Sequence, residues 1–247
     1  MERFIDKFKR GTQYVDIVSS VTVNELTSVD RVADDYCSKD CIKFIPASGA
    51  ATRMFKDLYS YLDDGVETEF VDRFFGELED FAFYEDIKDS IESKKLNKET
   101  TDGRVGIIDS VLNSELNYGD LPKALIKIHS YGDCSTTPID EHIYEGEHYL
   151  NKDSVGLHFT ISEEHEELFN IHNEIALRGK ANIDISYSFQ KKQTDTLAVD
   201  MDNSPFALEN EEVLYRAGGH GALIENLNDL DADIVFIKNI DNVCHRS

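Results

Sequence analysis

The residues best suited to chemistry in this chain lie in one stretch, residues 44–56, which reads Phe-Ile-Pro-Ala-Ser-Gly-Ala-Ala-Thr-Arg-Met-Phe-Lys. An apolar run passes through a bend of very small side chains into an amphipathic segment, an order that predicts strand, tight loop and helix. A helix N-terminus presents unpaired N–H groups and partial positive charge, which small neighbours leave accessible to a ligand's oxygens. The helix dipole does not favour cations such as Arg53 and Lys56 at this end of a helix, so their presence indicates an anionic ligand. The stretch therefore predicts a phosphate-binding loop.

This loop matches neither of the two common phosphate-binding motifs. The Walker pattern requires a Gly-Lys-Ser/Thr ending, and the dinucleotide fingerprint requires a different glycine spacing. The alternative interpretation is a loop of small residues that only allows the strand to pack on the helix.

Three further positions could complete a phosphate site. Lys123 follows Pro122, whose fixed φ angle would hold a neighbouring cation in place, although a solvated lysine explains it equally well. The glycine-rich bend at residues 218–221 would let a flat nucleobase lie against the backbone, or it is only the entry turn of a helix. Asp241, at the end of a predicted strand, could ligate Mg²⁺, which prefers hard oxygen ligands, or it is an ordinary turn residue.

The elements that must position these residues alternate between strand and helix. Strands are predicted at 41–47, 155–161, 183–189 and 233–241. Helices are predicted at 52–62, 69–90, 106–116, 138–150, 162–179 and 222–228, with an exposed loop at 94–104, an apolar strand after Lys123 and short strands at 194–215. This alternation predicts an α/β domain with a mostly parallel sheet and flanking helices. Ligands of such sheets bind at the carboxyl ends of the strands, where Ser48–Arg53, Ser162, Gln190 and Asp241 fall.

Composition limits the partners of the chain. Its 247 residues carry a formal net charge of −24, from 49 acidic and 25 basic residues, so we expect neither nucleic acid nor an anionic membrane as a partner. The four cysteines are too few and too scattered for a disulfide scaffold and are expected to be reduced thiols. The charged N-terminus and the lack of an apolar run of ~20 residues predict a cytoplasmic protein.

In their order along the chain, these motifs resemble those of sugar nucleotidyltransferases, especially UDP-sugar pyrophosphorylases. The family signature is an apolar strand, then Ala-Gly-Gly-x-Gly-Thr-Arg-Leu, and later Pro-Lys; residues 47–54 and 122–123 stand in these places. The family's Met-Thr-Ser strand end is similar to residues 159–162, and its Phe-Gln segment to residues 189–190. Its Gly-Asn-Gly base-binding turn is similar to residues 219–221, and its metal-binding Val-Asp-Asn strand end to residues 239–242. More closely still, the chain resembles a nucleotidyltransferase-like family labelled as a domain of unknown function.

The resemblance implies a Rossmann-like, glycosyltransferase-A-like nucleotidyltransferase domain at 41–247. The polar pattern of residues 1–40 separately predicts a helical flank before it. The implied reaction joins a nucleoside triphosphate and a sugar 1-phosphate with release of pyrophosphate. By resemblance, Arg53 and Lys123 would be catalytic, Asp241 would hold Mg²⁺, and Lys56 would be a supporting or structural cation. The nucleotide would be bound by Ala47, Ser48, Gly49, Ala50, Thr52, Gln190, Gly219, His220 and Gly221.

The sequence also departs from that family pattern. Ser48 and Ala51 replace glycines, and His220 replaces the asparagine that would contact the base. The chain ends six residues after Asp241, where those enzymes continue with a sugar-binding half, so the resemblance predicts a domain that is incomplete at its C-terminus. A nucleotide- or sugar-phosphate-binding protein without turnover is therefore the alternative function.

Overall fold

The computed structural model describes residues 2–11, 16–20, 22, 39–49, 51, 54–150, 154–180, 182–208 and 210–246. The chain divides into two compact units. The sheet unit contains Asp40–Phe189 and Ala232–Ser247, and the second unit contains Met1–Lys39 and Gln190–Asp231. No helix within the described ranges is both long enough and apolar enough to cross a membrane.

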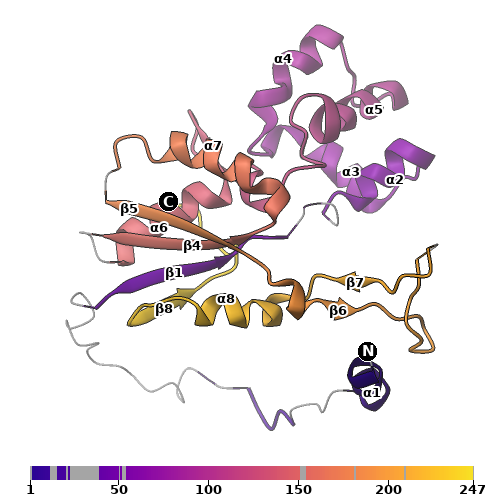
Figure 1. Cartoon of the computed structure of the whole chain (residues 1–247). Coiled ribbons are helices and arrows are strands. Elements are labelled where there is room, and N and C mark those ends of the chain that lie inside the picture. Colours follow the sequence, from indigo (N-terminus) through magenta and orange to yellow (C-terminus); the bar gives the residue numbers. More distant parts are fainter. Residues whose placement is uncertain are drawn as a thin grey trace. The chain divides into compact units, whose positions relative to one another are not determined.

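The sheet unit is built on four parallel strands, β1 (Cys41–Pro46), β4 (Val155–Ile161), β5 (Ile183–Phe189) and β8 (Ile234–Ile237), in the order β5-β4-β1-β8 (Figure 1). The predicted strands are confirmed, although β8 is shorter than predicted. The strands β1 and β4 are almost continuously buried, as expected for the middle of a parallel sheet. Because the chain adds β4 and β5 on one side of β1 and then β8 on the other, the direction of winding reverses between β1 and β8.

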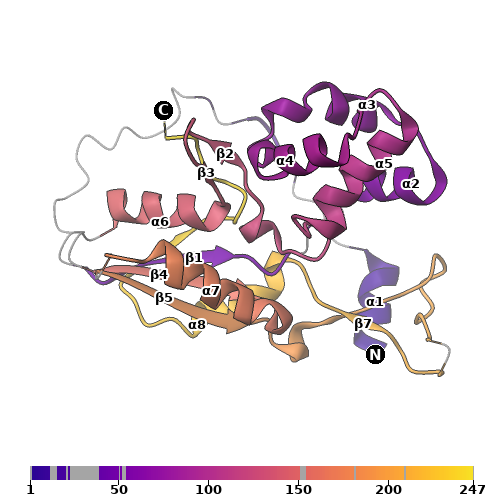
Figure 2. The same cartoon turned by 90° about the horizontal axis from the view of Figure 1, so that it is seen from above.

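Two helices, α6 (Pro138–Tyr149) and α7 (Glu166–Ala176), cover one face of this sheet (Figures 1 and 2). The ring of Phe159 on β4 contacts His142 of α6 and Phe169 of α7, which places both helices on the same side. The predicted start of α6 is confirmed: Thr137 and Asp140 form a reciprocal capping box, with Pro138 at the first helical position.

The chain between β1 and α6 forms a group of helices (Figure 2). The side chains of this group have an apolar core of their own. The group consists of α2 (Lys56–Asp64), α3 (Glu69–Gly76), η4 (Leu78–Asp80), α4 (Tyr84–Lys94), α5 (Thr101–Asp109) and the π-helical turn η5 (Ser110–Ser114). The single helix predicted at 69–90 is wrong, because the chain breaks between α3 and α4. The stacked rings of Phe81 and Phe83, 5.1 Å apart, pack at this core, whereas residues two apart on a helix point to different sides.

Two other predictions in this region are corrected. The exposed loop predicted at 94–104 ends early, because Thr100 caps α5 by accepting a hydrogen bond from the Gly103 N–H. The strand predicted after Lys123 is instead a short 3₁₀ turn, η6 (Lys123–Leu125), whose preceding residue Pro122 is its N-cap. A small hairpin of β2 (His129–Ser130) and β3 (Ser135–Thr136) then leads into α6.

The second unit contains the helix α1 (Glu2–Arg10) and a set of short elements. Of the flank predicted to be helical at 1–40, residues 16–20 and 22 have no regular secondary structure. The predicted short strands are confirmed as the antiparallel pair β6 (Thr196–Leu197) and β7 (Tyr215–Arg216), which follow η8 (Lys192–Thr194). The helix predicted after the glycine-rich bend is present as η9 (His220–Leu223) and α8 (Ile224–Asn228).

A buried lysine lies in the middle of the sheet. The side chain of Lys43 on β1 is 0% exposed, and its Nζ donates to Glu145 Oε2 at 2.9 Å and to the His142 carbonyl oxygen at 3.3 Å. Burial lowers the pKa of Lys43 from 10.5 to about 8, against the opposing effect of Glu145. Glu145 also accepts from Lys238 at 2.7 Å, so one carboxylate serves two ammonium groups.

We predict that Lys43→Met stabilises the protein by about 2 kcal/mol at pH 7, because Glu145 keeps Lys238 as a partner and is not left as an unpaired buried charge. The pKa of Lys43 is lower in the folded than in the unfolded chain, so burying the charged amine costs most below pH 8. This cost falls as the pH rises from about 8 to 10.5, and the gain from the substitution should fall with it. Urea unfolding of both proteins across this pH range measures the difference.

Lys192→Met, at an exposed lysine, is the control and should change the unfolding free energy by less than about 0.5 kcal/mol. A loss of stability in Lys43→Met at pH 7 would show that the hydrogen bonds of the ammonium group outweigh its burial.

Candidate functional site

The loop after β1 is held by the neighbouring strand and by η6. The Ala47 N–H donates to the Thr160 carbonyl at 2.8 Å, and the Ser48 carbonyl accepts from Ser162 Oγ at 3.3 Å. The Gly49 carbonyl accepts from the Lys123 N–H at 3.3 Å. A Cβ atom at Gly49 would meet no described atom within 4 Å.

Three of the predicted loop residues, Ala50, Thr52 and Arg53, lie outside the described residues. Ala51, expected to line the phosphate site, is 0% exposed and belongs to the core of the helical group. The helix after the loop begins at Lys56 rather than at the predicted Thr52, and its N-cap is Phe55. Among the described residues, no side chain caps this N-terminus, so its first-turn N–H groups are not satisfied in that way.

The structure brings Lys123 and Asp241 together, although they are 118 residues apart in the sequence. Lys123 Nζ lies 3.3 Å from Asp241 Oδ2, and the two side chains are 36% and 59% exposed. Because the Lys123 backbone also holds Gly49, the ion pair lies beside the loop after β1. The group therefore lies at the carboxyl ends of β1 and β8, between which the direction of winding reverses, and ligands of open α/β sheets bind at such a point.

The predicted metal ligand, Asp241, provides a single carboxylate. In the part of the chain that the structure describes, no three His, Cys, Asp or Glu side chains are grouped to hold a metal ion. Mg²⁺ in nucleotide sites is commonly held by one or two carboxylates together with the phosphates of the ligand. The residues present therefore suit a metal bound with a phosphorylated ligand better than a metal held by protein alone.

The remaining predicted residues lie in the second unit and are described separately. Gln190 Nε2 donates to Asp195 Oδ1 at 3.2 Å and lies beside the glycine-rich bend, 3.8 Å from where a Cβ of Gly218 would be. Gly218 itself is required by packing, since that Cβ would lie 2.8 Å from the Ala222 side chain. At Gly219 and Gly221 a Cβ would meet no described atom within 4 Å. The His220 side chain is outside the described residues.

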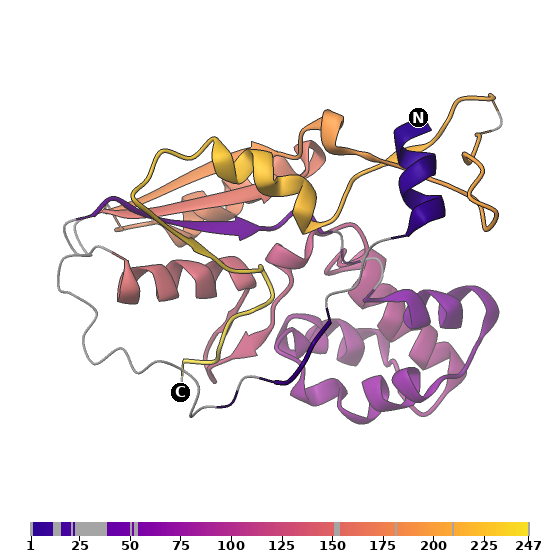
Figure 3. The ribbon, with the colours of Figure 1, turned by 90° about the horizontal axis from the view of Figure 1, so that it is seen from below.

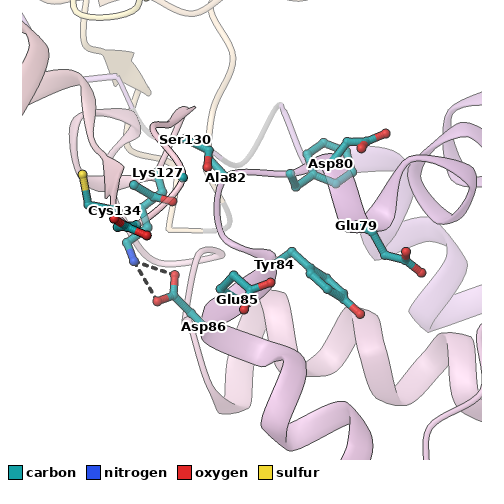
Figure 4. Close-up of a pocket in the computed structure, with 13 residues that line it drawn as sticks. Glu79, Asp80, Ala82, Tyr84, Glu85, Asp86, Lys127, Ser130 and Cys134 are labelled. Carbon is teal, nitrogen blue, oxygen red and sulfur yellow. Dashed lines mark hydrogen bonds and ion pairs between the residues drawn. The ribbon is translucent and has the colours of Figure 1, made fainter.

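One cavity in the sheet unit, away from the Lys123–Asp241 pair, does not suit phosphate. It has a volume of about 430 Å³ and is lined by five carboxylates but only one lysine, Lys127. Lys127 Nζ is already bound to both carboxylate oxygens of Asp86 at 2.7 Å (Figure 4). Another cavity, of about 390 Å³, is lined largely by apolar and aromatic side chains of the helical group. The carboxylates of the 430 Å³ cavity repel an anion, and the apolar lining of the 390 Å³ cavity solvates an anion poorly.

The sequence did not reveal two contacts of the candidate site. Ser162, at the start of the helix predicted at 162–179, precedes the short 3₁₀ turn η7 (Glu163–His165); within the described residues its side chain makes no capping bond and instead donates to the Ser48 carbonyl. The ion pair of Lys123 and Asp241 was not foreseen either, because no local pattern relates residues that far apart.

Comparison with curated proteins and with solved structures gives no match. A family model described as "Domain of unknown function (DUF4301)" matches residues 1–247. This match covers the whole sequence, and the chain belongs to the DUF4301 family, a domain of unknown function.

Proposed function

We propose that the protein binds a nucleoside triphosphate at the carboxyl ends of β1 and β8 and transfers its nucleotidyl group to a sugar 1-phosphate. The observation that carries the proposal is the position of the Lys123–Asp241 pair beside Gly49, at the point where the direction of winding reverses. A cation at this point of a chain with a net charge of −24 favours an anionic ligand. The parallel sheet and its strand order support a Rossmann-like nucleotidyltransferase fold as part of the proposal.

The proposed reaction needs no general base, because a sugar 1-phosphate is already an anion. A phosphate oxygen of the sugar attacks the α-phosphorus, the bond to the bridging oxygen of the β-phosphate breaks, and pyrophosphate leaves with the electron pair. The protein would then act by positioning and charge neutralisation, with Lys123 beside the α-phosphate and Arg53 on the triphosphate. Asp241 would hold Mg²⁺, which supplies further neutralisation of the phosphate charge.

The second candidate function is binding of a nucleotide or sugar phosphate without turnover. Two observations favour binding without turnover. The Asp241 carboxylate is paired with Lys123. Ser48 and Ala51 stand where sugar nucleotidyltransferases, which the sequence resembles, have glycines. Both candidates use the same loop and ion pair. Release of pyrophosphate from a nucleoside triphosphate and a sugar 1-phosphate separates them.

We predict that Asp241→Asn changes pyrophosphate affinity in opposite directions with and without Mg²⁺. Without metal, the carboxylate competes with the ligand for Lys123, so its removal should tighten binding about fivefold, equivalent to roughly 1 kcal/mol. With Mg²⁺, the carboxylate is needed as a ligand, so its removal should weaken binding about tenfold. Isothermal titration calorimetry with pyrophosphate in both conditions measures the two effects.

Asp86→Asn is the matched control, because Asp86 is also a surface carboxylate paired with a lysine, and its substitution should leave both affinities unchanged. The exposed Lys123–Asp241 pair is worth at most about 1 kcal/mol, so Asp241→Asn should remain folded by circular dichroism. A change in the same direction in both conditions would contradict the assignment of Asp241 as a metal ligand.

We predict that Arg53→Ala lowers the rate of pyrophosphate release by ~10²–10³, the usual loss for one preorganised charge contact. Lys56→Ala, the matched control in the same segment, should cost less than tenfold. Coupled assays with a panel of nucleoside triphosphates and sugar 1-phosphates provide the rates. An effect of Arg53→Ala below about tenfold would remove this residue from the mechanism, and binding without any release would favour the second candidate.

A further inference from the structure

The segment that carries Asp241 runs from the end of β8 past the N-terminal half of α6 (Figure 3). Residues 238–246 form no helix or strand. Among the described residues, their backbone hydrogen bonds include Lys238 N–H to the Phe44 carbonyl and Asn242 N–H to the Asn239 carbonyl, both at 3.1 Å. With so few backbone bonds of its own, the segment depends on other elements for its conformation.

His142 of α6 holds the backbone immediately before Asp241. Its Nε2 lies 3.2 Å from the Asn239 carbonyl oxygen and 3.1 Å from that of Ile240. The imidazole is fully buried, and burial, reinforced by the nearby charge of Lys43, lowers its pKa to about 4. His142 is therefore neutral near pH 7, with its proton on Nε2, and donates to the two carbonyls.

Two carboxylates of the same helix hold the segment on either side of this contact. Upstream of Asp241, Glu145 accepts from Lys238 Nζ at 2.7 and 2.8 Å. Downstream, the buried carboxylate of Glu141 accepts from Arg246 Nε at 2.8 Å. The guanidinium group of Arg246 also lies over the ring of Tyr144, 4.2 Å from its centroid.

The hairpin before α6 strengthens the downstream contact. The hydroxyl of Tyr131 donates to Glu141 at 2.9 Å and accepts from the Arg246 N–H at 3.0 Å. The ring of His245 stacks on Tyr131 with centroids 4.3 Å apart. The end of the segment is thus bound through both side chains and backbone.

We propose that α6 positions Asp241, with His142 as the central positioning residue and the contacts of Glu145 and Glu141 as flanking anchors. Among the described residues, the side chain of Asp241 is oriented by its exposed 3.3 Å ion pair with Lys123, which is too weak to fix the backbone. The consequence for ligand binding rests on the proposed function of Asp241, whereas the positioning itself does not.

Hydrogen–deuterium exchange of His142→Ala tests the positioning directly. Loss of the imidazole should raise exchange of the Asn242 amide, which is hydrogen-bonded to the Asn239 carbonyl, at least tenfold and leave the core of the helical group unchanged. His142→Gln should restore most of the protection, because the amide Nε2 can donate near the position of the imidazole Nε2. His148→Ala is the matched control, a histidine on the exposed side of the same helix, and should leave the segment unchanged.

Pyrophosphate binding in the presence of Mg²⁺ supplies the second measurement. His142→Ala should weaken binding about tenfold, as Asp241→Asn does, and His142→Gln should bind nearly as the wild type. Arg246→Gln removes the downstream anchor at the surface and should raise exchange at 242–246 without unfolding the core.

Unchanged exchange at 239–246 in both His142→Ala and Arg246→Gln would overturn the positioning proposal. Raised exchange in a protein whose wild type binds no pyrophosphate would retain the positioning and overturn the proposed function. An equal effect of His142→Ala and His142→Gln on the segment would show that the hydrogen bonds from Nε2 are not what holds it.

Discussion

One carboxylate, that of Glu145, connects the parts of the sheet unit on which the candidate site depends. It accepts from Lys43, in the middle of β1, and from Lys238, just after β8, while Glu145 itself lies on α6. A fully buried ammonium group is stable only with a partner, so the burial of Lys43 constrains where α6 can lie against β1. Through Lys238, the same carboxylate also constrains the chain that leaves β8.

The candidate site lies at the carboxyl ends of the two strands, β1 and β8, that these contacts of Glu145 connect to α6. The strand order places these two strands side by side at the reversal of winding, and the described residues that directly follow them, 47–49 and 238–246, have no regular structure. The loop after β1 is held by Ser162 and Lys123, and the segment after β8 by α6. The cation Lys123 and the carboxylate of Asp241 therefore meet at the accessible carboxyl ends of these strands, in an otherwise strongly acidic protein. The phosphorylated ligand and divalent cation that we propose would bind at this arrangement.

The accuracy of the sequence predictions followed the range of the interactions involved. The strands predicted at 155–161 and 183–189 agree with β4 and β5 residue for residue. Their pattern of apolar and polar residues depends only on neighbouring positions in the sequence. The capping box at Thr137 is equally local. The helix predicted at 69–90 failed because Phe81 and Phe83 pack at one core, a tertiary demand that overrides helical periodicity. The strand predicted after Lys123 failed because an apolar run alone does not distinguish a strand from a buried turn.

The sequence by itself determined the α/β alternation, the position of the small-residue loop and membership of the DUF4301 family, because these depend on neighbouring residues or on the order of residues along the chain. Only the tertiary structure decided which distant groups meet. Lys123 pairs with Asp241, Ser162 binds the Ser48 carbonyl, and His142 holds the carbonyls before Asp241. Such contacts depend on strand order and helix placement, which are set by the packing of the whole unit and leave no local signature in the chain.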